Sequence, residues 1–138
     1  MLVVCDTNVL VSGVLNPDGP PGRIVDLVTA NLIQLAFDDR ILHEYSAVLQ
    51  RPRFGFRPAA VEALLAYVQL FGTRVTALPM DPSRCPDPKD LPFAEVAVSG
   101  SVDYLVTGNT AHYRFLPNYT ALVIPPAEFV RKLAEQGS

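Results

Sequence analysis

The chain has 138 residues, 49% of them hydrophobic, and carries a formal net charge of −3 with an isoelectric point near 5.2. This composition suits one globular domain over residues 1–138 and provides no global basic field to attract nucleic acid. No window approaches the length of a membrane span and the N-terminus lacks a signal-peptide pattern, so we expect a cytoplasmic protein with no membrane partner. Cys5 and Cys85 imply no disulfide framework, and Cys5 is expected to be a buried hydrophobe.

Strand-like and helix-like patterns alternate along the whole chain, and prolines cluster at the boundaries between them. In chain order we expect strands over residues 2–5, 32–37, 74–78, 103–107 and 121–124, and helices over residues 9–15, 21–31, 39–50, 58–71, 92–99 and 127–134. Helices between successive strands are typical of a parallel sheet. The predicted fold class is therefore α/β, a three-layer αβα domain with a central parallel sheet of about five strands.

Polar residues follow two of the predicted strands directly. Asp6, backed by Thr7 and Asn8, comes after the first strand, and Thr107 and Asn109 come at the end of the fourth. Strand ends in a parallel sheet meet at one edge, where ligands bind, so these side chains are expected to be neighbours. A plain Gly-Asn turn is the alternative at the second position. Asp103 begins the fourth strand, at the opposite edge, and is expected to be structural.

Three further carboxylates are candidates for the same cleft. Glu44 falls at the edge of the apolar stripe of its helix, which suits either a cleft residue or an ordinary exposed one. Asp90 stands at an N-cap position, where it either only caps or also binds a cation with its second oxygen. Asp87 is a further candidate, with a turn residue as the alternative. Glu95 points away from the apolar face of its helix and is expected to be solvated.

Several carboxylates gathered in one cleft, with no lysine nearby, stay ionised only if a cation compensates their charge. Oxygen ligands select hard ions such as Mg²⁺ or Mn²⁺. Such sites support phosphoryl chemistry, because the ions generate a hydroxide and clamp the attacking and leaving oxygens.

Five stretches of sequence carry a family resemblance. They are VCDTNVLVS at residues 4–12, LQRPRF at 49–54 after the helix that bears Glu44, DPKD at 87–90, DYLVTGN at 103–109 and PAEFV at 126–130. Together, and over nearly the whole chain, they resemble the PIN-domain family, most closely the VapC-like toxin components of bacterial and archaeal toxin–antitoxin pairs.

The resemblance implies a Mg²⁺- or Mn²⁺-dependent endoribonuclease on a Rossmann-like αβα domain. Asp6, Glu44 and Asp90 would be the catalytic metal ligands, with Asp87 as an alternate or additional one. The fourth acidic position of the family falls on Asn109, whose amide still coordinates through its carbonyl oxygen but removes a negative charge. A PIN-like module that binds RNA or protein without cutting is therefore the alternative, and the occupancy of a second metal position stays open.

The resemblance also implies orienting residues and partners. Thr7, Asn8 and Thr107 would orient the carboxylates or the attacking water. A homodimer held by its helices, and an antitoxin that blocks the site, would be the protein partners.

One basic and aromatic cluster is the candidate for contact with the RNA substrate. It consists of Arg51, Arg53 and Arg57, interleaved with Phe54 and Phe56. Arginine pairs with phosphate and aromatic rings stack on unpaired bases. A solvated loop with inward-packed phenylalanines explains the same residues equally well. Arg114 and His112 are further candidates for RNA contact, and no catalytic role is assigned to His112.

Overall fold

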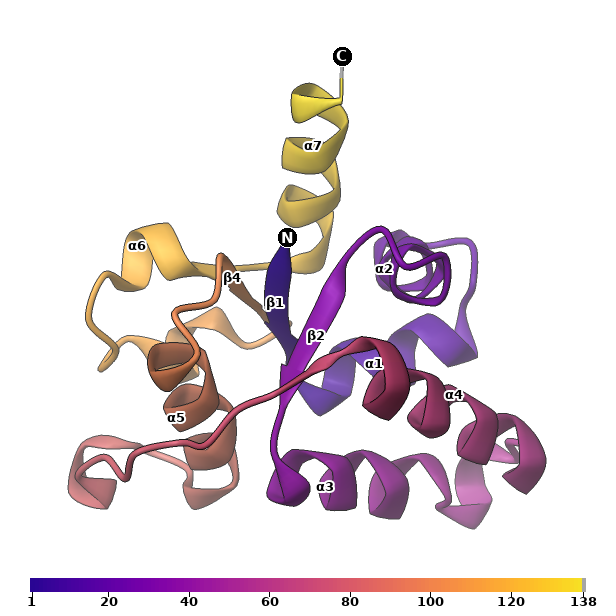
Figure 1. Cartoon of the computed structure of the whole chain (residues 1–138), viewed down its shortest axis with the longest axis horizontal. Coiled ribbons are helices and arrows are strands. Elements are labelled where there is room, and N and C mark those ends of the chain that lie inside the picture. The colour runs from indigo at the N-terminus through magenta and orange to yellow at the C-terminus, as the bar shows by residue number, and fades with distance from the viewer. Residues whose placement is uncertain (138) are drawn as a thin grey trace.

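The computed structural model describes residues 1–137 and has a five-stranded parallel sheet at its centre, in the order β3-β2-β1-β4-β5 (Figure 1). The strands are β1 (Leu2–Cys5), β2 (Gln34–Phe37), β3 (Thr73–Arg74), β4 (Tyr104–Val106) and β5 (Val123–Ile124). The helices are α1 (Thr7–Leu15), α2 (Pro20–Thr29), α3 (Asp39–Leu49), α4 (Pro58–Phe71), α5 (Leu91–Ser99), α6 (Tyr119–Leu122) and α7 (Pro126–Gln136). Short 3₁₀ helices cover Pro52–Phe54, Pro82–Arg84, Pro88–Asp90 and Thr110–Tyr113. The predicted three-layer α/β architecture is confirmed.

Strand β1 lies at the centre of the sheet because its apolar side chains can be buried on both faces. It pairs with β2 on one side and β4 on the other, with Cys5 opposite Val106. Cys5 is fully buried, as expected, and its carbonyl oxygen accepts a 2.5 Å hydrogen bond from the hydroxyl of Tyr45 on α3. This bond ties α3 to the end of β1, directly before Asp6.

Two predicted strands are shorter than expected, for reasons visible in their hydrogen bonds. The second begins at Gln34 rather than residue 32, because Asn31 takes a left-handed turn (φ 58°) and Leu32 N–H still bonds to the carbonyl of Leu27. The third ends at Arg74, not residue 78. The N–H group of Leu78 donates to Ser99 Oγ at 2.8 Å, so the chain leaves the sheet for α5.

The last predicted strand is also shorter, since residues 121 and 122 belong to helix α6 and only Val123–Ile124 pairs with β4. Asp103 lies at the amino-terminal edge of the sheet, where its carboxylate accepts a 2.9 Å hydrogen bond from Leu2 N–H. The expected structural role of Asp103 is confirmed. Among residues 1–137, no helix is both long enough and apolar enough to span a membrane.

Helices α1 and α2 pack so closely that glycine is required between them. A Cβ atom on Gly13 would lie 2.6 Å from both the carbonyl oxygen of Pro21 and Cγ2 of Val25. This contact fixes α1, whose first residue is Thr7, against the rest of the fold.

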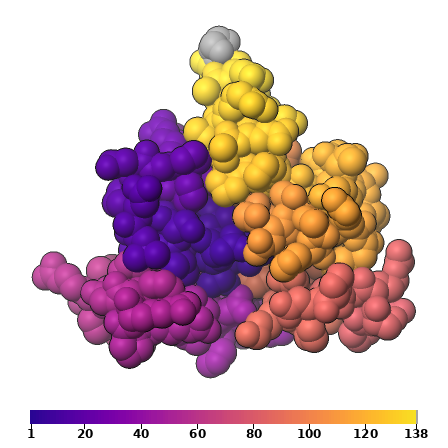
Figure 2. Space-filling model, turned by 180° about the vertical axis from the view of Figure 1, so that it is seen from behind, coloured from indigo at the N-terminus to yellow at the C-terminus, as the bar shows by residue number. Residues whose placement is uncertain are grey.

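The carboxyl ends of β1, β2 and β4 open towards the same end of the molecule, opposite the projecting helix α7 (Figure 1). Seen from behind, the segment that follows α3 and the segment that precedes α5 form two lobes with N-terminal residues between them (Figure 2). The candidate site lies at this edge.

Candidate functional site

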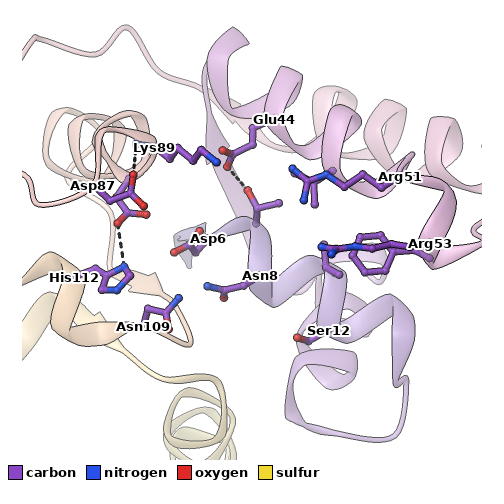
Figure 3. Close-up of a pocket in the computed structure, with 15 residues that line it drawn as sticks. Asp6, Asn8, Ser12, Glu44, Arg51, Arg53, Asp87, Lys89, Asn109 and His112 are labelled. Atoms are coloured by element: carbon purple, nitrogen blue, oxygen red, sulfur yellow. Dashed lines mark hydrogen bonds and ion pairs between the residues drawn. The ribbon is translucent and has the colours of Figure 1, made fainter.

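A cleft of about 480 Å³ opens at the carboxyl edge of the sheet. Its polar lining residues come from five parts of the chain: Asp6, Thr7, Asn8, Ser12, Glu44, Arg51, Arg53, Asp87, Lys89, Asp90, Asn109 and His112. Figure 3 shows Asp87, His112 and Asn109 on one side, Arg51 and Arg53 on the other, and Asp6 and Asn8 between them. All five predicted metal ligands thus line one cleft.

Asp6 sits at the floor of the cleft and is only 6% exposed. Its backbone N–H donates to the carbonyl oxygen of Val106 at 2.9 Å and so continues the hydrogen bonding between β1 and β4. This bond fixes Asp6 at the end of β1. Its Oδ2 accepts hydrogen bonds from Thr107 Oγ1 at 2.8 Å and from the Tyr113 hydroxyl at 3.0 Å. The expected proximity of Asp6 and Thr107 is confirmed, because both follow neighbouring parallel strands.

Asp90 lies directly before helix α5, and it is close to Asp6 because both carboxylates neighbour the hydroxyl of Tyr113. Its Oδ1 lies 3.4 Å from the Tyr113 hydroxyl, and its Oδ2 lies 3.2 Å from His112 Nδ1. Burial, then the negative charges of Asp6 and Asp87, raise the pKa of Asp90, while His112 opposes the shift. Asp90 occupies the N-cap position of α5 as predicted, but its side chain makes no capping bond. Its two oxygens face Tyr113 and His112 instead.

Glu44 lies at the half-buried rim of α3, as the helical pattern predicted. Its carboxylate accepts a short hydrogen bond from the Thr7 hydroxyl. Helix α3 begins at this edge because the Asp38 side chain caps it, accepting from Ile41 N–H at 3.1 Å. Thr7 therefore contacts the carboxylate that the resemblance assigns as a metal ligand.

The remaining polar candidates shape the loops around the cleft. The Asp87 carboxylate accepts from Lys89 N–H at 3.0 Å, so Asp87 does act as a turn residue, while it also lines the cleft. Asn8 Oδ1 accepts from Gly108 N–H at 3.2 Å and holds the loop after β4. The backbone N–H of exposed Asn109 donates to Thr107 Oγ1 at 3.0 Å.

The basic and aromatic cluster divides in two. Arg51 and Arg53 line the cleft, and the Arg53 guanidinium lies 4.8 Å from the centre of the Phe54 ring. Arg57 instead borders a separate apolar pocket, which also includes Phe56 and Leu49 at the end of α3. Arg114 is not part of the cleft lining. Both phenylalanines are partly buried against the core, which supports the inward-packing interpretation of the rings.

Two further expectations about the surroundings of the carboxylates were wrong. Lys89 lies in the cleft and extends towards Glu44, although no lysine was expected there (Figure 3). Glu95 is buried rather than solvated, because Arg40 Nη1 donates to it at 2.6 Å and Met80 N–H donates at 2.7 Å.

Tyr113 is the functional candidate that sequence reasoning missed. No sequence motif identifies it; the signal available was a tyrosine four residues after Asn109, beyond the end of β4. Its hydroxyl is buried between Asp6 and Asp90, and burial followed by those two charges raises its pKa. It is therefore a protonated donor throughout the neutral range.

The five predicted metal ligands have the chemistry that a hard divalent cation requires, since they offer carboxylate and amide oxygens. Asp6 and Asp90 converge on one hydroxyl, whereas Glu44 is bonded to Thr7. Within residues 1–137, no three His, Cys, Asp or Glu side chains are close enough together to hold one ion. The observed arrangement therefore contains a converging pair, with Glu44 held apart at the rim.

Comparison with known proteins agrees with this architecture. The chain is 26% identical over 141 residues to Uncharacterized protein MJ1680 of Methanocaldococcus jannaschii, with 94% of this chain and 90% of that protein covered. Residues 2–111, which include the sheet from β1 to β4 and every polar residue of the cleft except His112, match the PIN domain. The chain therefore belongs to the PIN domain family, with its nuclease-like fold.

Proposed function

We propose that this protein is a Mg²⁺- or Mn²⁺-dependent endoribonuclease that hydrolyses RNA phosphodiester bonds with an activated water. Membership of the PIN domain family supports a nuclease. One observation carries the proposal furthest: Asp6 and Asp90, 84 positions apart in the sequence, are both buried and converge on a single hydroxyl. Two buried carboxylates that repel one another are costly to maintain unless a cation compensates them in the working state.

In this proposal Asp6, Glu44 and Asp90 hold the cation, with Asp87 and Asn109 as additional oxygen donors. A bound Mg²⁺ or Mn²⁺ lowers the pKa of water and stabilises negative charge on a phosphate. Thr7 orients Glu44 and Thr107 orients Asp6 through the hydrogen bonds described above.

Arg51 and Arg53 are proposed to bind the RNA backbone on the opposite side of the cleft. Within residues 1–137 neither guanidinium is paired with a carboxylate, so both are available to donate hydrogen bonds to phosphate oxygens. The ring of Phe54 supports the Arg53 guanidinium and limits its rotation. Arg57 and Arg114 lie outside the cleft lining, so any contact they make would be with RNA that extends beyond it.

The biological role proposed is that of the toxin in a type II toxin–antitoxin pair in the cytoplasm. It would form a homodimer through its helices and bind an antitoxin that covers the cleft. Leu70, which is 75% exposed on α4, and Phe71, which is 42% exposed, provide apolar surface for such contacts. Size-exclusion chromatography with light scattering tests the dimer, which a monomer at all concentrations would contradict.

A second candidate is a module that binds RNA without cutting it, and Asn109 favours it because a carboxylate is absent there. The two functions are separated by incubating labelled single-stranded and structured RNA with the purified protein in Mg²⁺, in Mn²⁺ and in EDTA. The nuclease predicts cutting with either cation and none in EDTA. Retention of RNA in a filter assay with no cutting under any of these conditions would favour the binding module.

A further inference from the structure

The hydroxyl of Tyr113 occupies the space between the two converging carboxylates. It lies 3.0 Å from Oδ2 of Asp6 and 3.4 Å from Oδ1 of Asp90, and the residue is fully buried. Tyr113 ends the 3₁₀ helix Thr110–Tyr113 that follows β4, so its side chain reaches the two aspartates from a third part of the chain. It thereby contacts both the residue that follows β1 and the residue that precedes α5.

The hydrogen bonds determine which oxygen atoms face the cleft. Both donors to Asp6, Thr107 and Tyr113, bind the same oxygen, Oδ2. The other oxygen, Oδ1, makes no hydrogen bond within the part of the chain that the structure describes. A carboxylate whose one oxygen accepts two hydrogen bonds has a fixed plane, and its second oxygen then presents a lone pair in a defined direction.

The same hydroxyl oxygen also lies 3.4 Å from Asp90 Oδ1, although its single proton can be donated to only one of the two aspartates at a time. The other oxygen of Asp90, Oδ2, lies 3.2 Å from His112 Nδ1. Without a donor between them, two adjacent carboxylates lower their energy by rotating apart, and Asp90 can do so because the cleft is open to water. The tyrosine ring cannot follow, since it is packed in the hydrophobic core. The hydroxyl, whose single proton lies between the two carboxylates and is shared by them, therefore favours their convergent arrangement.

We propose that Tyr113 is a positioning residue that preorganises Asp6 and Asp90 to bind the divalent cation. This inference rests on the proposed function. Tyr113 acts through the two carboxylates and touches neither substrate nor cation. A phenylalanine would fill the same volume, so the contribution belongs to the hydroxyl alone.

The test is Mn²⁺ binding to the metal-free protein, measured by isothermal titration calorimetry on wild type and Tyr113→Phe. Loss of a group that orients metal ligands weakens metal binding about 10- to 100-fold, and we expect a loss in that range. Tyr67→Phe is the matched control: Tyr67 lies on α4, packs on Phe71, and lines a pocket remote from the cleft. It should leave the affinity unchanged.

A second measurement keeps the test decisive if Tyr113→Phe weakens the fold. Ligand that binds only the native state raises the melting temperature by an amount set by its concentration and affinity. At equal Mn²⁺ concentration, the rise should be smaller for Tyr113→Phe than for Tyr67→Phe. A residue with a purely structural role would lower the starting melting temperature and leave the rise unchanged.

The outcomes separate the two proposals. Equal Mn²⁺ affinity and equal thermal shifts in wild type and Tyr113→Phe would overturn the role of Tyr113 while leaving the nuclease proposal intact. A wild-type protein that binds no Mn²⁺ by either measurement would overturn the cation-dependent function, and the positioning role with it. Weaker binding confined to Tyr113→Phe would support both.

Discussion

The ion pair between Arg40 and the buried Glu95 is expected to stabilise the site, and Glu95→Gln is the change that tests it. Arg40 lies near the start of α3, which carries Glu44, while Glu95 lies on α5, which begins directly after Asp90. Glu95 also holds the loop before the site, because it accepts a 2.7 Å hydrogen bond from Met80 N–H. The pair thus connects the two walls of the cleft.

The magnitude follows from the burial of the two partners. The Glu95 side chain is 5% exposed and that of Arg40 is 46% exposed. Breaking a fully buried pair costs about 3–5 kcal/mol, and an exposed pair contributes about 0–1 kcal/mol. A buried acid with a half-exposed partner lies between these limits, so we expect Glu95→Gln to lower the free energy of unfolding by about 2–3 kcal/mol. For a domain of this size that corresponds to a melting temperature lower by about 6–12 °C.

Urea unfolding followed by circular dichroism measures this difference, with Asp39→Asn as the matched control. Asp39 also pairs with an arginine, Arg74, but its side chain is 87% exposed. Its loss should therefore change the free energy of unfolding by less than about 1 kcal/mol. Equal destabilisation by the two substitutions would refute the assignment of Glu95 as a buried structural acid.

Three further predictions concern charge, thiols and packing. Because the pKa of Asp90 is raised in the folded state, its ionisation destabilises the metal-free fold at neutral pH, so Asp90→Asn should be more stable than wild type in EDTA at pH 7. The gain in stability should shrink as the pH falls through the pKa of Asp90 in the folded protein, and it should vanish below the pKa of the unfolded chain, near 3.8. A gain that is constant with pH would contradict this explanation. Burial, with a smaller contribution from the charge of Asp6, raises the pKa of Cys5 to about 12. Ellman's reagent should therefore label Cys5 at pH 8 only after unfolding, and rapid labelling of Cys5 in the native protein would contradict this prediction. Gly13→Ala should lower stability by about 1–3 kcal/mol through overpacking against α2, and a neutral effect in thermal melts would show that α1 and α2 separate easily.

The fold was largely predictable because its elements have strong local signals. Helix α4 has the predicted bounds, since Pro58 suits the first turn and Gly72 follows the last residue. The third strand was overestimated because Val75 and Ala77 give an apolar alternation whatever their backbone groups bond to. Only the structure shows that Leu78 and Met80 donate to side chains of α5 instead of a strand.

The site was predictable where it depends on topology and not where it depends on loop conformation. Asp6 and Thr107 meet because parallel strand ends share an edge. Tyr113 reaches them only through the 3₁₀ helix after β4, which no pattern specifies. Glu95 was misplaced because helix α5 is covered on more than one face: all of Phe93–Ala97 is buried, which an analysis that assumes a single apolar face cannot reveal.

The central claim is that Asp6 and Glu44 belong to a nuclease site, and RNA cleavage by charge-removing variants tests it most directly. Wild type, Asp6→Asn, Glu44→Gln and the exposed α2 control Asp26→Asn would be compared on labelled RNA in Mn²⁺, after circular dichroism confirms that each is folded. Cleavage should disappear in the two site variants and persist in Asp26→Asn. Undiminished cleavage by folded Asp6→Asn would contradict the account.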